Sequence, residues 1–169
     1  IASICETIDT LITTGEVFEI KALNSKICGE RNKHGYYNDT VKAAIDAYDH
    51  NTKGKFNVYI GLNPRADDLP ITNELITSSG IKDRTNPAYD AHDTDITRIR
   101  WILVDVDPVN KKHGGSNEEQ LAAACKITKM VRRWFIQHGC PAPHTAFSGN
   151  GYHLLYSVDF PLERAKDIK

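Results

Sequence analysis

The sequence predicts a mixed α+β fold, and three observations indicate it. Apolar residues recur at helical spacing in some segments and alternate at strand spacing in others, with turn-forming residues between them. The second half of the chain runs as a strand, a helix, a hairpin and the start of another helix. A hydrophobic content of 40% and a charged content of 25% over 169 residues are those of a soluble globular chain that can bury a core. We expect two modules, an N-terminal α/β module over residues 1–97 packed with a second module over residues 98–169.

The first module begins with a helix and a strand. Helical spacing of apolar residues over residues 3–13, ending before Gly15, predicts a short amphipathic helix. Alternation over residues 17–23, with Glu19 and Lys21 between apolar positions, predicts a half-exposed strand. A polar loop is expected to follow, over residues 24–37.

A second helix and strand are expected after that loop. Asn38 or Asp39 can cap a helix that runs to about Asp49. Its predicted apolar face consists of Val41, Ala44, Ile45 and Tyr48. Residues 56–62 alternate as a strand, and the proline-containing stretch 63–97 predicts an irregular excursion with at most one helix near residues 71–77.

The second module begins with an apolar strand over residues 99–106, followed by a loop at 111–115 and a helix over residues 117–138. Ser116 and Glu119 fit a capping box at the start of this helix, and Gly139 fits its end. Its predicted apolar face consists of Leu121, Cys125, Ile127, Val131, Trp134 and Phe135.

A hairpin is predicted next, from strands at residues 145–148 and 152–158 joined by Gly149, Asn150 and Gly151. The order β-α-β-β-α is most of a ferredoxin-like or RNA-recognition (RRM) module, with its last strand missing. In that topology the first strand is central and lies beside the strand that carries His153. The carboxylates at the end of the first strand would then share a pocket with this histidine.

Composition narrows the classes of protein. A net charge of −1 excludes a globally basic surface for nucleic acid, although a local basic groove remains compatible with it. Cys5, Cys28, Cys125 and Cys140 form no C-x-x-C pair, so we expect reduced thiols, a cytoplasmic location and no zinc site. The chain has no run of about 18 apolar residues and no leader-like N-terminus, so we expect no membrane association.

The strand WILVDVDP, residues 101–108, ends on two carboxylates separated by one valine. Alternation along a strand places Asp105 and Asp107 on the same face, roughly 6–7 Å apart at Cα. Such a pair must be hydrogen-bonded, neutralised or bound to a cation, and hard oxygen ligands favour Mg²⁺ or Mn²⁺. The alternative is a structural pair that caps a loop or binds Arg98 and Arg100.

A second motif, SGNGYHLLY, covers the predicted hairpin bend at residues 148–156. Glycine allows backbone N–H groups to approach an anion closely, and Ser148 and His153 offer side-chain donors to phosphates. The alternative is a glycine turn with an unrelated histidine.

Together, these two motifs resemble the first two motifs of the archaeo-eukaryotic primase superfamily, in particular the primase-polymerase domains of phages, plasmids and other mobile elements. Flanking segments also resemble such proteins; they read VFEIKAL, GYYND, VYIGLNP and DTDITRIRW. The resemblance covers most of the chain.

The resemblance implies a DNA primase-polymerase, which synthesises or extends primers by nucleotidyl transfer on a single-stranded DNA template. It implies that Asp105 and Asp107 hold two Mg²⁺ or Mn²⁺ ions. Ser148, Gly149 and His153 would hold the phosphates of the nucleoside triphosphate, Arg98 would contact phosphate or the template, and Asn63 would line the same groove. A downstream helicase is a further expected partner.

In this family a third metal-binding Asp follows on a later segment, which would fall beyond Lys169. The chain begins without Met and ends within a predicted helix, so we expect a piece of a longer protein with an incomplete metal set, which would leave this piece inactive alone.

Two other classes of function remain open from the sequence. One is a non-catalytic RRM-like module that binds single strands or nucleotides, with Trp101, Tyr152 and Tyr156 as stacking residues. The other is an enzyme of a different kind that uses Asp-x-Asp: a haloacid-dehalogenase-type phosphatase with Asp105 as a nucleophile, or a sugar-nucleotide transferase.

Overall fold

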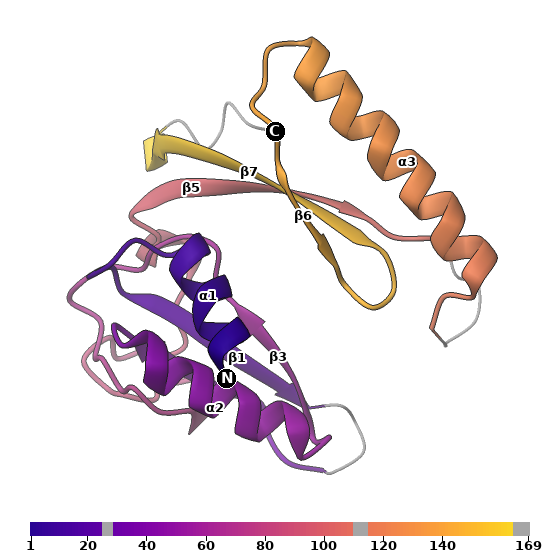
Figure 1. Ribbon diagram of the computed structural model, residues 1–169. Helices are drawn as coiled ribbons and strands as arrows, with labels where there is room; N and C mark the ends of the chain where they lie inside the picture. Colours follow the sequence, from indigo (N-terminus) through magenta and orange to yellow (C-terminus); the bar gives the residue numbers. More distant parts are fainter. Residues whose placement is uncertain (25–28, 110–114, 164–169) are drawn as a thin grey trace. The chain divides into compact units, whose positions relative to one another are not determined.

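The structure is a computed structural model that describes residues 1–24, 29–109 and 115–163 (Figure 1). It divides into two compact units. Unit 1 is Ile1–Ile99 together with the segment that begins at Phe160, and unit 2 is Arg100–Asp159. The described residues form three α-helices and two antiparallel sheets, so the predicted mixed α+β class is confirmed.

Unit 1 contains a four-stranded sheet in the order β3-β1-β2-β4. The strands are β1 (Phe18–Asn24), β2 (Lys33–Tyr37), β3 (Phe56–Ile60) and β4 (Ile76–Thr77). All three pairings are antiparallel, and Ile20 at the centre of β1 lies opposite Gly35 of β2 and Ile60 of β3.

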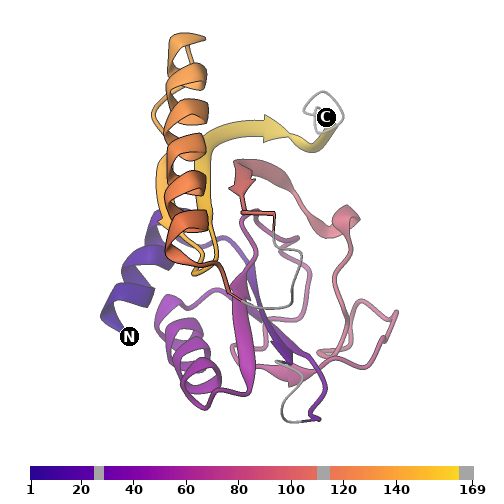
Figure 2. The same cartoon turned by 90° about the vertical axis from the view of Figure 1, so that its right-hand side faces the viewer.

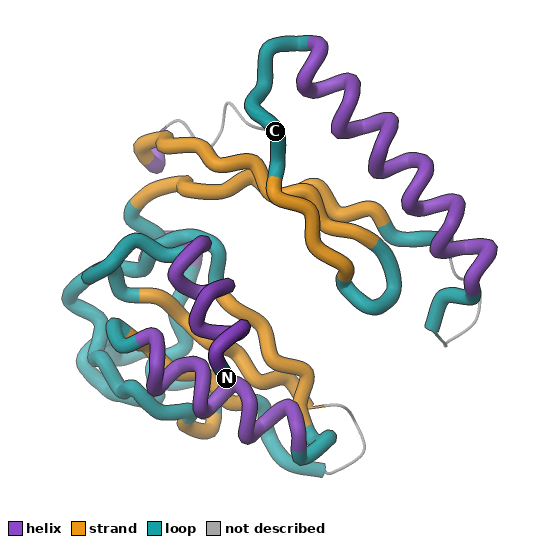
Figure 3. The backbone as a smooth tube through the Cα atoms, viewed as in Figure 1, coloured by secondary structure: helices purple, strands orange, loops and turns teal. Residues whose placement is uncertain are grey.

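Two helices, α1 (Ala2–Leu11) and α2 (Thr40–Thr52), accompany this sheet (Figure 3). Helix α2 packs against β1, β2 and β3, and α1 packs against α2. The carboxylate of Asp39 accepts hydrogen bonds from the backbone N–H groups of Val41 and Lys42, which fixes the start of α2 as the sequence predicts.

Two predictions for unit 1 are wrong. The predicted polar loop contains β2, whose residues from His34 to Tyr37 are all buried. The buried residues of α2 are Ala43, Ala44 and Ala47, whereas Val41, Ile45 and Tyr48 are at least 41% exposed. The small alanines let the helix lie close to the sheet, while the larger apolar residues keep much of their surface exposed.

The irregular stretch after β3 contacts the sheet and its loops, and it contains only β4 and a 3₁₀ turn at Asp93–Asp95 among regular elements. Leu69 and Tyr89 from this stretch pack with Val17 and Tyr36 in one buried cluster. The predicted irregular excursion is therefore present, without the helix near residues 71–77.

This stretch also buries the side of β1 that the sequence predicts to be half-exposed. Arg65 forms backbone bridges with Val17 and Ile96, and its guanidinium pairs with the Glu19 carboxylate at 2.5 Å. Glu19 is 1% exposed, so a residue expected to face solvent forms a buried ion pair.

Unit 2 contains a three-stranded sheet and one helix. The elements are β5 (Arg98–Val106), α3 (Glu118–Gln137), β6 (His144–Phe147) and β7 (Tyr152–Pro161). The order is β5-β7-β6, so the first strand lies beside the strand of His153 as predicted. The central strand of the described sheet is β7, however, and not the first strand as the sequence predicts. In Figure 1, β5 and β7 run in opposite directions, and Figure 2 shows α3 lying along this sheet. The rings of Phe135 and Tyr156, 4.8 Å apart, join α3 to β7.

Two details of α3 differ from prediction. Asn117, not Ser116, is the N-cap: its side chain accepts from the backbone N–H of Gln120, whose side chain accepts from the backbone N–H of Asn117. Ile127 and Trp134, predicted to lie on the apolar face, are 52% and 54% exposed.

Cys5, Cys125 and Cys140 are free thiols, as expected, while Cys28 lies outside the described residues. The C-terminal helix and most of the loop predicted at 111–115 also lie outside them. Among the described helices, none has the length and apolar character needed to cross a bilayer.

Candidate functional site

The candidate site begins at the end of β5, where burial alternates along the strand. Val104 and Val106 are half-buried, while Asp105 and Asp107 are exposed. Asp105 is the next-to-last residue of β5, and Asp107 is the first residue after the strand. A carboxylate pair is thus presented to solvent at the tip of an apolar strand.

Strand pairing brings one of these carboxylates to His153. The end of β5 meets the start of β7 because the two strands are antiparallel neighbours. His153 is the second residue of β7, and its Nε2 lies 3.5 Å from Oδ1 of Asp105. The structure therefore brings together Asp105 and His153 from two separate motifs.

The site lies on the side of the sheet away from α3. Alternation along β7 puts Tyr156, which contacts Phe135 of α3, and His153 on opposite faces. Helix α3 thus supports the strands from one side, and Asp105 and His153 lie on the other.

The tip of the hairpin is a tight turn organised by Ser148. Its Oγ accepts hydrogen bonds from the backbone N–H groups of Gly151, at 2.8 Å, and Asn150, at 3.3 Å. Gly149 has φ of +90°, a conformation that glycine adopts without strain. Since a hydroxyl has two acceptor lone pairs and one proton, these bonds use the acceptor side of Ser148 and direct its O–H elsewhere, which suits donation to an anion.

Gly151 fixes the distance between this tip and the carboxylate pair. A Cβ at Gly151 would overlap the carboxylate of Asp107 and the carbonyl oxygen of Val106. Gly151 is buried. Only a residue without a side chain allows the hairpin to approach β5 this closely, so Gly151 serves the position of Asp107.

Asn150 ties the hairpin tip to the segment before α3. The side-chain oxygen of Asn150 accepts hydrogen bonds from the Ser116 backbone N–H, at 3.0 Å, and from the Ser116 hydroxyl, at 2.6 Å. The Ser116 hydroxyl also lies 2.8 Å from the backbone carbonyl oxygen of Asn150. The sequence-based prediction missed this link, because Ser116 and Asn150 are far apart in the chain and neither carries a motif that points to the other.

The remaining two predicted site residues belong to unit 1. Arg98 is the first residue of β5, so the extended strand separates it from Asp105 by roughly 23 Å at 3.3 Å per residue. Asn63 belongs to unit 1, three residues after β3. The structure therefore does not group either residue with the carboxylate pair by strand pairing.

The alternative in which arginines hold the carboxylate pair finds no support from Arg100. Its Nη1 lies 2.8 Å from Oδ1 of Asp159, at the far end of β7. This ion pair therefore joins β5 and β7 at the end of the strand pair that is remote from Asp105 and His153.

The fit of this site to a divalent cation is partial. Asp105 and Asp107 supply hard carboxylate oxygens, and Gly151 leaves room beside Asp107. Within residues 1–24, 29–109 and 115–163, no group of three or more His, Cys, Asp or Glu side chains is placed to hold a metal. The described chain therefore offers a two-carboxylate site rather than a complete cage.

The three aromatic residues considered for stacking on bases differ in accessibility. Trp101 is 8% exposed and Tyr156 is 4% exposed, so both belong to the interior of the protein. Tyr152 is half-buried, with its ring 5.4 Å from that of Phe147. This arrangement does not present a row of aromatic rings for single strands.

A serine, a histidine and an aspartate also meet in unit 1. Ser78 Oγ and Asp90 Oδ1 each lie 2.9 Å from His34, but both contact the same ring nitrogen, Nδ1. A catalytic relay needs the serine and the carboxylate on different ring nitrogens. This group therefore stabilises the fold and does not form a nucleophile.

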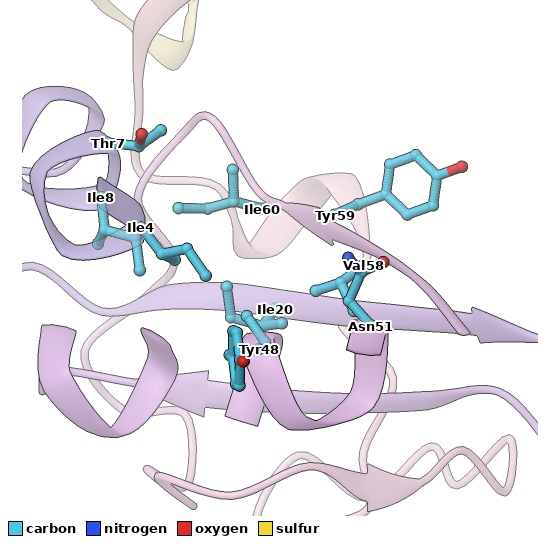
Figure 4. A pocket seen from close by; sticks show the side chains of 10 residues that line it. Ile4, Thr7, Ile8, Ile20, Tyr48, Asn51, Val58, Tyr59 and Ile60 are labelled. Carbon is cyan, nitrogen blue, oxygen red and sulfur yellow. The ribbon is translucent and has the colours of Figure 1, made fainter. Parts of the chain in front are cut away.

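The larger of the two cavities described, about 250 Å³, lies in unit 1 among α1, α2, β1 and β3. Figure 4 shows Ile4 and Ile8 of α1, Ile20 of β1 and Ile60 directed toward it, with Tyr48 and Asn51 from α2. None of its described lining residues is charged. It is an apolar cavity without groups that would bind phosphate or a metal.

Comparison with known proteins returned no relationship: no family model, no curated protein and no solved structure matches this chain.

Proposed function

We propose that this chain carries a metal- and nucleotide-binding site for phosphoryl chemistry on nucleoside triphosphates. More particularly, we propose that it belongs to a DNA primase-polymerase of the archaeo-eukaryotic primase type, which performs nucleotidyl transfer on a single-stranded DNA template. Its partners would be nucleoside triphosphates, template and primer, and a helicase.

One observation carries the proposal. The Asp-x-Asp strand end and the Ser-Gly-Asn-Gly-Tyr-His hairpin are separate in the sequence, yet Asp105 and His153 lie 3.5 Å apart and Gly151 abuts Asp107. The carboxylates of the first motif therefore lie beside the histidine and the glycine turn of the second, and clustered ionisable groups of this kind are typical of functional sites.

The finer fold assignment belongs to the same proposal. Unit 2 has the strand order of the first three strands of an RRM or ferredoxin-like module, in which a helix follows the first strand and covers one face. We assign unit 2 to this type, and unit 1 to an α/β module that accompanies it.

Each residue of the site has a role in this proposal. The Ser148 hydroxyl donates to a phosphate oxygen, and the Gly149 turn lets backbone N–H groups approach the same anion. The His153 ring donates a hydrogen bond that stabilises negative charge on the leaving pyrophosphate. Asp105 and Asp107 would hold two Mg²⁺ or Mn²⁺ ions, of which one would acidify the attacking 3′-hydroxyl and the other would neutralise the triphosphate.

The other classes of function fit the geometry less well. A haloacid-dehalogenase-type phosphatase places its aspartates on a parallel sheet, whereas β6 and β7 are antiparallel and follow directly after α3. A stacking module for single strands would need exposed aromatic rings, and Trp101 and Tyr156 are buried.

Calorimetry of Mn²⁺-dependent dATP binding tests the proposal. We expect the chain to bind dATP only when Mn²⁺ is present, and the double variant Asp105→Ala, Asp107→Ala to lose this binding. The matched control removes two other exposed carboxylates, in Asp49→Ala, Asp67→Ala, and should bind as the unaltered chain does. Equal binding by the site variant and the unaltered chain would reject the assignment, as would the absence of metal-dependent binding in both.

A further inference from the structure

Unit 1 contains a second, smaller cavity whose lining is basic. It has a volume of about 180 Å³ and is lined by Glu30, Lys33, His50, Lys53, Lys55 and Phe56. These residues come from separate parts of the chain: the start of β2, the last turn of α2 and the turn into β3. We call this cavity the lysine pocket.

An aromatic ring organises two of the basic groups. Phe56 is 4% exposed, with Nζ of Lys33 located 5.3 Å from its ring centroid and the His50 ring 5.6 Å away, edge to face. An ammonium group over an aromatic face is held by the negative charge of the ring. Lys33 is thus fixed in place rather than free in solvent.

The hydrogen bonds of His50 determine which nitrogen faces the lysine. Its Nδ1 lies 2.9 Å from the carbonyl oxygen of Asp46, which can only accept, so Nδ1 carries the proton. In the neutral ring, Nε2 then accepts from the Lys33 ammonium at 3.4 Å. His50 therefore orients Lys33 toward the pocket without adding a competing negative charge.

The charge in the pocket is unbalanced. Three ammonium groups face one carboxylate, Glu30, which pairs with Lys55 at 2.7 Å. The hydrogen bond from Lys55, together with the positive charges of Lys55 and Lys33, lowers the pKa of Glu30. The surplus is about two positive charges in a chain whose net charge is −1.

We propose that the lysine pocket binds a phosphate group of single-stranded DNA. The surplus charge calls for an anion, and Lys53 and Lys55 are exposed and can reach one. The volume is below the roughly 300–1,000 Å³ of pockets that enclose a whole small molecule, so a single phosphate of a longer strand fits better than an entire nucleotide. The choice of DNA rests on the proposed function.

The test measures binding of a fluorescently labelled oligothymidylate over a range of salt concentrations. In Lys53→Gln, Lys55→Gln we expect weaker binding at every salt concentration. The slope of log affinity against log salt should be reduced by about 0.7, the contribution of one phosphate contact to a single strand. The variant leaves the Lys33, His50 and Phe56 group intact, so the fold is preserved. Lys53→Arg, Lys55→Arg should keep the slope.

The matched control is Lys42→Gln, Lys82→Gln, which removes the same charge from two exposed lysines outside the pocket and should leave the slope unchanged. Equal effects of the two glutamine variants would overturn the proposal, and so would an unaltered chain that fails to bind the oligonucleotide. A further arm uses inorganic phosphate as competitor. In one outcome, phosphate competes with the oligonucleotide for the unaltered chain and not for Lys53→Gln, Lys55→Gln, while the variant keeps its oligonucleotide affinity. That result would assign the pocket to free phosphate and overturn the assignment to a strand.

The two proposals fail separately. If Lys53→Gln, Lys55→Gln binds DNA normally while Asp105→Ala, Asp107→Ala loses Mn²⁺-dependent dATP binding, the pocket assignment is wrong and the nucleotide site stands. The reverse pattern retains the pocket and rejects the nucleotide site.

Discussion

Gly151 lies where the hairpin tip meets the end of β5, and it is the residue on which the geometry of the carboxylate pair depends. A side chain there overlaps both the backbone of Val106 and the carboxylate of Asp107. The Val106 carbonyl oxygen and the Asp107 Cα cannot move without displacing the end of β5. Adding a single methyl group at position 151 would therefore disturb the candidate site by shifting the backbone at the end of β5, without removing any functional group.

Gly151→Ala should destabilise the protein by about 1–3 kcal/mol, the range for a group forced into a packed position, and should weaken Mn²⁺-dependent dATP binding. Urea unfolding and calorimetry measure the two effects. Gly115→Ala is the control, because a Cβ at Gly115 meets nothing within 4 Å. Similar behaviour of the two variants would show that the close approach to Asp107 does not exist.

The buried pair of Glu19 and Arg65 gives a second prediction at this scale. Arg65→Ala leaves the Glu19 carboxylate, 1% exposed, without the guanidinium 2.5 Å away. Lys21, whose Nζ lies 3.4 Å from Oε1 of Glu19, remains as a more exposed partner. We therefore expect a loss near the lower end of the roughly 3–5 kcal/mol that breaking a buried ion pair costs in the free energy of unfolding. Arg31→Ala, at an exposed position, should cost far less in the same urea titration. A loss no greater than that of the control would contradict a buried pair.

At the scale of elements, two consecutive residues at the start of α3 have different structural roles. Asn117 caps the helix, while Ser116 binds Asn150 at the hairpin tip. Sequence patterns alone assign the cap to Ser116, since serine followed by glutamate three residues later is a common capping box. The shift by one residue frees Ser116 to hold the hairpin.

Substitutions at these two residues should have different effects. Asn117→Ala should cost about 1 kcal/mol of stability and leave dATP binding unchanged, because only the helix cap is lost. Ser116→Ala should keep the cap and weaken Mn²⁺-dependent dATP binding, because the hairpin tip loses its tie. Hydrogen exchange in the first turn of α3 and calorimetry distinguish the two outcomes. The opposite pattern would show that Ser116 is the cap.

Most elements were predictable from local pattern, and β2 shows where local pattern fails. The segment Lys33–Tyr37 reads as a polar loop because it contains a lysine, a histidine and a glycine. It is buried because it lies between β1 and β4, and because Gly35 lies against the backbone of Glu74, where a Cβ would not fit. These contacts are made by residues that are distant in the chain, so they cannot be predicted from any short stretch of the sequence.

Helix α2 shows a different failure of local pattern. Its larger apolar residues suggest one buried face, whereas the alanines at 43, 44 and 47 are the residues that are buried. Hydrophobic spacing identifies the helix, but the face that packs depends on how closely the sheet approaches. A small residue such as alanine allows that approach, but hydrophobicity scales rank alanine below the larger apolar residues, so the pattern points to the wrong face.

At the scale of the whole molecule, stability should depend on pH through Asp95, which is 3% exposed in unit 1. Burial opposes its charged form, but the backbone N–H of His92, the hydroxyl of Tyr89 and the guanidinium of Arg84 outweigh burial and lower the pKa of Asp95. A carboxyl group with a lowered pKa in the folded state contributes stability above its unfolded pKa, near 3.8. That contribution is lost as the pH falls through the folded value.

Asp95→Asn should therefore be less stable than the unaltered chain at neutral pH, and the difference should shrink on acidification to about pH 3, since only the carboxyl group titrates there. Urea unfolding midpoints at the two pH values measure this. A difference of equal size at both would contradict a lowered pKa at Asp95.

The candidate site was partly predictable at this scale because topology is predictable. A strand, a helix and a hairpin in that order place the third strand beside the first, which brings His153 to Asp105. The lysine pocket and the tie between Asn150 and Ser116 were not predictable, because each depends on side chains meeting across turns whose geometry is not encoded in any periodic pattern.

The four residues of β6, His144–Phe147, are all exposed, and in the described chain this strand has β7 as its one neighbour. An outer strand of this kind offers backbone N–H and C=O groups to a strand of another molecule. Pro141 and Pro143 immediately precede it, and the turn at Ser148 ends it, so the pairing edge is short. Proline has no N–H to donate, so a partner strand that paired with β6 would find no donor at Pro143 with which to extend the pairing.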